Sequence, residues 1–183
     1  GGATYQWQSS PDGSTWSDIS GATLPTRVVS QTVTTWYQCV VTCGANSTPS
    51  TPLQVNMALA LSGTYTINSA VATGGTNFQT FGALKELLNC VGVSGPVTVN
   101  VVAASGPYTE QVQFNVISGA SAVNTITING NGNTLSFGAT VSTAPGTLVL
   151  NGTDYMTVNN LTVAGTGGTY ALACHLYNQA DNN

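Results

Sequence analysis

The sequence predicts an all-β protein built from two regions, and three observations lead to this prediction. Apolar and polar residues alternate with the period of two that is typical of strands, in runs of about four residues. Gly, Asn, Pro or Ser separates almost every pair of runs, as turns require. A single stretch, at about residues 78–90, has the 3/4 apolar spacing of an amphipathic helix. Most of the chain is therefore expected to form short strands.

The first region, residues 1–57, carries a tryptophan on one predicted strand and a Tyr-x-Cys sequence on another. These residues are Trp7, Tyr37 and Cys39. The pattern resembles the core of an immunoglobulin-like sandwich, in which a Trp on strand C packs against the cysteine of strand F and a Tyr precedes that cysteine by two residues. The resemblance implies that the three residues are structural and buried together. Strands A and B would come before Trp7, so a partial sandwich without them is expected.

Three more strands are expected in the first region, because short apolar runs follow turn signals there. They comprise residues 16–19, 26–29 and 53–55. Residues 58–62 then form a short joint, since they have neither the Pro-rich nor the Gly/Ser-rich composition of a long spacer. The second region is residues 63–183.

The four cysteines do not define a disulfide framework. Cys39 and Cys43 share strand parity and would lie about 13 Å apart on an unbroken strand, too far for a disulfide, although a turn at residues 42–44 would shorten that distance. The partner of Cys39 is expected on the absent strand B. Cys90 and Cys174 are expected to be buried thiols that behave as small apolar residues, with a disulfide between them as the alternative.

The second region is predicted to start with a strand at residues 64–67 and the helix at about 78–90, which Thr76 or Asn77 can cap. Short strands follow, and such strands bury little alone and gain stability by stacking coil on coil. A helix that precedes the coils can cover the open end of the stack. The predicted strands are residues 97–101, 111–114, 125–128, 134–137, 147–150, 155–158 and 160–163.

Asparagines at the turns between these strands have an expected structural role. Asn tolerates left-handed backbone angles and bonds to nearby backbone. Stacked coils can also align such side chains into ladders. The asparagines in question are Asn129, Asn131, Asn133, Asn151, Asn159 and Asn160.

Three segments around the helix carry a family resemblance. They are Gly75-Thr76-Asn77-Phe78, the run at residues 94–101, and residues 108–112, whose Tyr108-Thr109-Glu110 is similar to the Y-x-E part of a G-x-Y-x-E segment. Together they resemble the N-terminal cap and first coils of right-handed parallel β-helix proteins, the pectin-lyase-like group. The resemblance implies that the second region is the start of such a β-helix.

The first region resembles the immunoglobulin-like modules of secreted Bacteroidota proteins. The segments that carry this likeness are residues 5–10, 12–16, 19–23 and 39–43. Large surface proteins and gliding adhesins that the type IX secretion system exports are built from such parts. The resemblance implies an extracellular or cell-surface location and an adhesive stalk or filament segment. The alternative is the non-catalytic N-terminal part of a polysaccharide-degrading, pectin-lyase-like enzyme.

The charge composition restricts the partners of the chain. Charged residues make up 4% of it, and Arg27 and Lys85 are its two cations. Nucleic acids are excluded as partners because their binding rests on many Lys and Arg contacts to phosphates. No run approaches the length of a membrane span, so direct membrane insertion is not expected. The expected partners are neighbouring modules of the same long chain or a chain that donates a strand, and a surface polysaccharide is a further candidate.

One candidate ligand-binding surface lies on the first region. Trp36, Gln38, Gln6 and Gln8 alternate away from the face of Cys39. An exposed Trp flanked by amides can stack on a sugar ring. The competing interpretation is that Trp36 packs against a neighbouring module or against the absent strands.

No catalytic residue, metal site or cofactor is expected in this segment. His175 is the single histidine, and no nucleophile-elbow pattern accompanies it. Asp154 and Asp181 lie apart in the sequence, whereas a calcium site needs clustered oxygen ligands. A calcium site stays an alternative only if the two aspartates stack on neighbouring coils. Nothing marks the pair of carboxylates that a glycosidase requires. The segment is therefore predicted not to be an enzyme.

Overall fold

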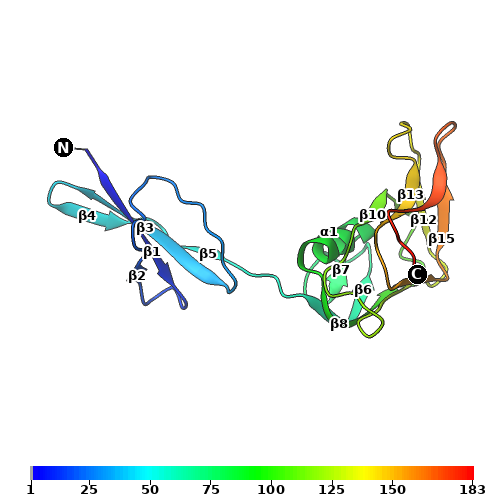
Figure 1. Ribbon diagram of the computed structural model, residues 1–183, viewed down its shortest axis with the longest axis horizontal. Helices are drawn as coiled ribbons and strands as arrows, with labels where there is room; N and C mark the ends of the chain where they lie inside the picture. The colour runs from blue at the N-terminus through cyan, green and yellow to red at the C-terminus, as the bar shows by residue number, and fades with distance from the viewer. Residues whose placement is uncertain (1) are drawn as a thin grey trace. The chain divides into compact units, whose positions relative to one another are not determined.

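The computed structural model describes residues 2–183, which are mostly β and contain one α-helix (Figure 1). Two compact units make up the chain: unit 1, residues 1–58, and unit 2, residues 59–183. No helix within residues 2–183 is long and apolar enough to cross a membrane.

Unit 1 is an antiparallel sheet with β3 at its centre. β1 pairs with one side of β3, and β4 and β5 pair with different halves of the other side. β2 extends the sheet beyond β1. The strands are β1 (Thr4–Ser10), β2 (Ser17–Asp18), β3 (Thr35–Cys43), β4 (Asn46–Pro49) and β5 (Leu53–Val55).

The strand predicted at residues 26–29 is wrong, and the one predicted at 16–19 shrinks to β2. Residues 19–34, called the crossing loop below, contain no strand. Thr26–Val29 is rich in β-branched residues, but strand propensity is realised through packing against neighbouring strands. The part of the chain that the structure describes provides no such neighbour for this run, so it stays irregular.

Unit 2 consists of three parallel sheets that the chain visits in rotation, so each circuit adds one strand to each sheet. The first sheet has the order β14 (Met156–Asn159), β11 (Ile126–Asn129), β8 (Val93–Val101), β6 (Leu61–Ile67) and β7 (Asn77–Phe78). The second is β15 (Thr162–Gly165), β12 (Thr134–Phe137) and β9 (Tyr108–Thr109). The third is β10 (Val112–Phe114), β13 (Gly146–Asn151) and β16 (Leu172–Tyr177).

The core of unit 2 lies between the sheets and is made by inward side chains in equivalent positions. Val97 of β8, Ile126 of β11 and Met156 of β14 stand side by side, and all three are buried. Each fully buried side chain of this size contributes about 1.5–3 kcal/mol. Alternation of apolar and polar residues thus keeps one face of β8, β10 and β11 in the core.

The helix α1 (Phe81–Val91) buries Phe81, Leu84 and Leu88 against this core. It begins later than the predicted residue 78, and its N-cap is Thr80 rather than Thr76 or Asn77. The reason is β7, in which Asn77 and Phe78 pair beside β6 and hold the chain extended up to the cap. β6 itself starts at Leu61, inside the joint predicted at residues 58–62.

Candidate functional site

The ladder between β1 and β3 sorts the predicted site residues of unit 1 onto two faces. Residues directly opposite each other in an antiparallel pair share a face. Gln8 lies opposite Gln38 and Ser10 opposite Trp36, while Trp7 lies opposite Cys39. The amide face therefore holds Gln6, Gln8, Trp36 and Gln38, and the cysteine face holds Trp7, Ser9, Tyr37 and Cys39.

The side-chain amides of the amide face bond within the sheet. Gln38 is buried, and its Nε2 donates to Gln8 Oε1 at 2.7 Å. Gln8 Nε2 donates in turn to the Asp18 carboxylate at 2.8 Å. Gln6 Nε2 donates to the backbone carbonyls of Trp7 and Ile19, at 2.9 Å each. These contacts tie β1 to β2, β3 and the crossing loop.

Trp36, the aromatic candidate on this face, is half-buried against a turn. Gly13 has a φ of +74°, and a Cβ at this residue would lie 3.1 Å from the indole ring. The close approach and the positive φ both favour glycine. The turn thus packs on the ring of Trp36 and occupies surface on which a sugar would stack.

Asp12 organises this turn. Its Oδ1 accepts hydrogen bonds from the backbone N–H groups of Ser14 and Thr15, both at 2.8 Å, and from the Ser10 hydroxyl at 2.8 Å. These bonds, with that from the Thr15 N–H contributing most, hold the pKa of Asp12 well below its ordinary value. The carboxylate stays charged in the fold, and the turn depends on it.

The cysteine face is less covered than the sequence predicts. Cys39 is buried as a free thiol, but Trp7 and Tyr37 are only half-buried. The crossing loop lies against this face, where Trp7 Nε1 donates to the Leu24 carbonyl at 2.9 Å. A loop supplies fewer packed apolar side chains than a second sheet would, and this explains the incomplete burial.

Two other cysteine predictions need correction. Cys90 and Cys174 are exposed free thiols, so neither the buried-thiol interpretation nor the disulfide between them holds. Cys90 lies off the buried stripe of α1, and Cys174 lies on β16, which pairs with β13. Partial burial nevertheless raises the pKa of the Cys174 thiol.

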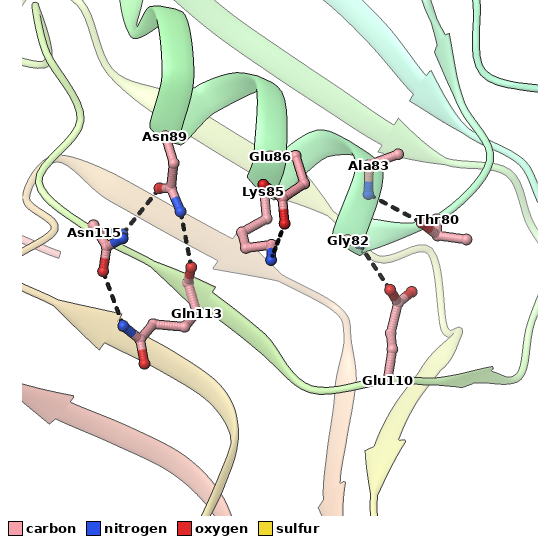
Figure 2. Close-up of polar contacts among 9 residues, drawn as sticks. All are labelled: Thr80, Gly82, Ala83, Lys85, Glu86, Asn89, Glu110, Gln113 and Asn115. Carbon is pink, nitrogen blue, oxygen red and sulfur yellow. Dashed lines mark hydrogen bonds and ion pairs between the residues drawn. The ribbon is translucent and has the colours of Figure 1, made fainter. Parts of the chain in front are cut away.

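In unit 2, a carboxylate from the first coil caps the helix (Figure 2). The Glu110 oxygens accept a hydrogen bond from the backbone N–H of Gly82 at 2.8 Å, which Figure 2 shows. They also accept one from the backbone N–H of Phe81 at 3.0 Å. Thr80 Oγ1 accepts a third, from Ala83, at 3.0 Å. Negative charge is favourable at a helix N-terminus. Glu110 therefore ties α1 to the chain that runs from β9 to β10.

At the other end of α1, the side-chain amide of Asn89 bonds to the backbone at the edge of β10, in the way that the backbone of a neighbouring strand would. Its Nδ2 donates to the Gln113 carbonyl at 3.1 Å, and its Oδ1 accepts from the Asn115 N–H at 3.0 Å (Figure 2). An unpaired strand edge is a site for unwanted association. One helix side chain thus closes part of the edge of β10.

Asparagine ladders run along the stack, and this expectation is confirmed. Asn159 donates to Asn129 at 3.3 Å, and Asn129 donates to Asn100 at 2.9 Å. A second ladder, from Asn178 through Asn151 to Asn115, has bonds of 2.7 and 3.0 Å. These side chains carry no charge and link equivalent positions of successive coils.

The carboxylates are occupied by contacts within the chain. Five of the six accept a hydrogen bond or form an ion pair: Asp12, Asp18, Glu86, Glu110 and Asp154. His175 stacks on Tyr177, with ring centroids 4.7 Å apart. Within residues 2–183, no three His, Cys, Asp or Glu side chains gather as a metal site would require.

Comparison with known protein families gives a match for unit 1. Residues 1–58 match a family described as a domain of unknown function (DUF8696). No curated protein and no solved structure matches the chain. The matched residues coincide with unit 1, so the structural boundary and the family boundary agree.

Sequence reasoning missed the two residues that hold α1 in place. Glu110 lies 28 residues from the Gly82 amide that it caps, and Asn89 lies 24 residues from Gln113. Local capping signals involve residues only three apart. The sequence does point to Glu110 in one way, because this residue belongs to the segment at residues 108–112 that resembles a parallel β-helix. That resemblance implies a coil of the β-helix, but it does not imply that Glu110 caps a helix.

Proposed function

We propose that this chain is a structural and adhesive segment of a large secreted or cell-surface protein. In this proposal, unit 1 is a partial immunoglobulin-like sandwich and unit 2 is the cap and first coils of a right-handed parallel β-helix. The segment forms part of a stalk or filament that displays binding surfaces. It belongs to the kind of adhesin that Bacteroidota export through type IX secretion.

The use of the carboxylates is the observation that carries the proposal. Four of the six bond to turns, strands or the helix, and a fifth, Glu86, pairs with its neighbour Lys85. Acid–base chemistry on a polysaccharide needs two carboxyl groups at a defined separation, free to reach the substrate. Almost all carboxylates of this chain bond to its own backbone or side chains. This use of the carboxylates favours a structural role over catalysis.

The asparagine ladders also support this role. Amides stacked from coil to coil give order along the axis of the stack without charges that salt would screen. One ladder lies on equivalent residues of β8, β11 and β14, and the other lies at the ends of β10, β13 and β16. A segment with this design keeps its shape in the variable medium outside a cell.

The proposed partners are neighbouring modules of the same long chain, or a chain that donates a strand to unit 1, together with a surface polysaccharide. The cysteine face supports the first two, because the crossing loop covers Trp7 and Tyr37 only partly. Added strands complete such half-covered sheets in other proteins.

The test uses the full-length protein in its source cells. Protease treatment of intact cells should remove the epitope of this segment, and deletion of the gene should reduce attachment to polysaccharide-coated surfaces. Purified full-length protein should release no reducing or unsaturated sugars from those polysaccharides. Sugar release with unchanged attachment would replace this proposal with the alternative, the front of a polysaccharide-degrading enzyme.

A further inference from the structure

Two cavities lie between the cysteine face of unit 1 and the crossing loop. The first has a volume of about 200 Å³ and has Trp7 in its lining. The second, of about 340 Å³, has Tyr37 and Ser9 in its lining. Arg27 and Val28 of the loop line both cavities, so the two adjoin at these residues.

Arg27 is a cation without a counter-ion at this site. The chain has two Lys and Arg residues, and the other, Lys85, is paired with Glu86. Within residues 2–183, no carboxylate lies within ion-pair distance of Arg27. No acidic residue lines either cavity. A guanidinium in such surroundings attracts an anion, and its planar donors match a carboxylate in a bidentate pair.

The remaining lining suits a sugar. Trp7 and Tyr37 stand on the same face of the sheet, and each is half-buried. Aromatic rings of this kind present an apolar face beside a polar edge. Side-chain hydroxyls that can bond to sugar hydroxyls come from Ser9, Thr23, Thr26, Ser30 and Thr35.

We propose that this Arg27 site binds an acidic polysaccharide whose sugars carry carboxylates. One carboxylate pairs with Arg27, and the sugars on either side occupy the two cavities beside Trp7 and Tyr37. The site lies on the face opposite the amide face. It depends on unit 1 alone and not on whether the whole protein forms a stalk.

The hydroxyl and aromatic lining favours a sugar over an acidic peptide. A peptide would need donors and acceptors for its backbone, such as a free strand edge along the cavity. The crossing loop, which contains no strand, forms the other side of both cavities. An acidic peptide is therefore the competing outcome of the test.

The test measures binding of alginate oligosaccharides to the chain by calorimetry, with a chelator present so that calcium cannot bridge sugar chains. Arg27→Gln should weaken binding about ten- to a hundredfold, as expected for loss of a charge-assisted contact. Val28→Asp should also weaken it, by repelling the carboxylate. Val28 is 97% exposed on a loop that pairs with no strand, so this change leaves the sheet intact.

Matched controls separate the site from general charge effects. Lys85→Gln removes the same charge from unit 2 and should leave the affinity unchanged. Carboxyl-reduced oligosaccharides of the same length should bind the native chain as weakly as alginate binds the Arg27→Gln variant. Three results would each overturn the proposal. The native chain could bind the carboxyl-reduced sugar as tightly as alginate, the Arg27→Gln variant could bind alginate as tightly as the native chain does, or the native chain could bind polyglutamate more tightly than alginate.

Discussion

At the scale of single residues, Glu110 links the helix to the first coil. Replacing it by Ala leaves the N–H groups of Phe81 and Gly82 without their carboxylate acceptor. Loss of a capping acceptor costs about 0.5–2 kcal/mol, so we expect Glu110→Ala to lower the free energy of unfolding of unit 2 by this amount in urea titrations. Glu86→Ala, which removes an exposed carboxylate from the same helix, is the control and should cost less than about 0.5 kcal/mol.

Asp12 gives unit 1 a dependence on pH. Its pKa in the fold is lowered, so its contribution to stability is complete above the ordinary value of 3.8 and is lost as the pH falls below that value toward the folded pKa. The Asp12→Asn variant should be less stable than the native chain at neutral pH and should lose less stability on acidification. NMR shifts of the Thr15 amide report the titration, and a midpoint at the ordinary carboxyl value in the native chain would contradict this account.

At the scale of elements, Asn89 offers a test of how α1 closes the edge of β10. Asn89→Asp keeps an oxygen for the Asn115 N–H but removes the donor to the Gln113 carbonyl. Asn89→Ala removes both contacts. We expect amide exchange of Asn115 to accelerate strongly in the Ala variant and weakly in the Asp variant, because a net hydrogen bond contributes about 0.5–1.5 kcal/mol. Equal exchange in both variants would show that the edge is protected by packing alone.

The strands of unit 2 could be predicted from sequence because their core residues alternate locally. Val97, Val99 and Val101 are all buried on one strand, and this pattern is visible in the sequence itself. Residues 26–29 have a similar composition but no pairing partner, and composition alone does not reveal that. The start of α1 was misplaced for the same reason, since the pairing of β7 with β6 decides where the helix begins.

The candidate sites were less predictable than the strands because they depend on contacts between distant residues. Alternation placed Trp36 and Gln38 on one face, as the ladder has them. It could not reveal that the Gln38 amide would donate to Gln8 and the Gln8 amide to Asp18, or that a turn would cover Trp36. The sequence does not mark Arg27 as a binding residue either. A single cation forms an anion-binding site only where the fold places cavities and aromatic rings around it, and the sequence does not show those.

At the scale of the whole molecule, the scarcity of charge makes stability insensitive to salt. Residues 2–183 contain one ion pair, Lys85–Glu86, with side chains 23% and 76% exposed. Exposed pairs of this kind contribute about 0–1 kcal/mol and are screened by salt. The other bonded carboxylates are held by uncharged donors. We therefore expect the free energy of unfolding to change by less than about 0.5 kcal/mol between low salt and about 1 M NaCl.

Urea unfolding at the two salt concentrations measures this, with Lys85→Gln as the matched variant. Native chain and variant should respond to salt alike, because the single pair that the substitution removes contributes little. A loss of several kcal/mol at high salt would require an ionic network. Two cations are too few to build one, so such a loss would contradict the view that neutral amides and backbone contacts hold this fold together.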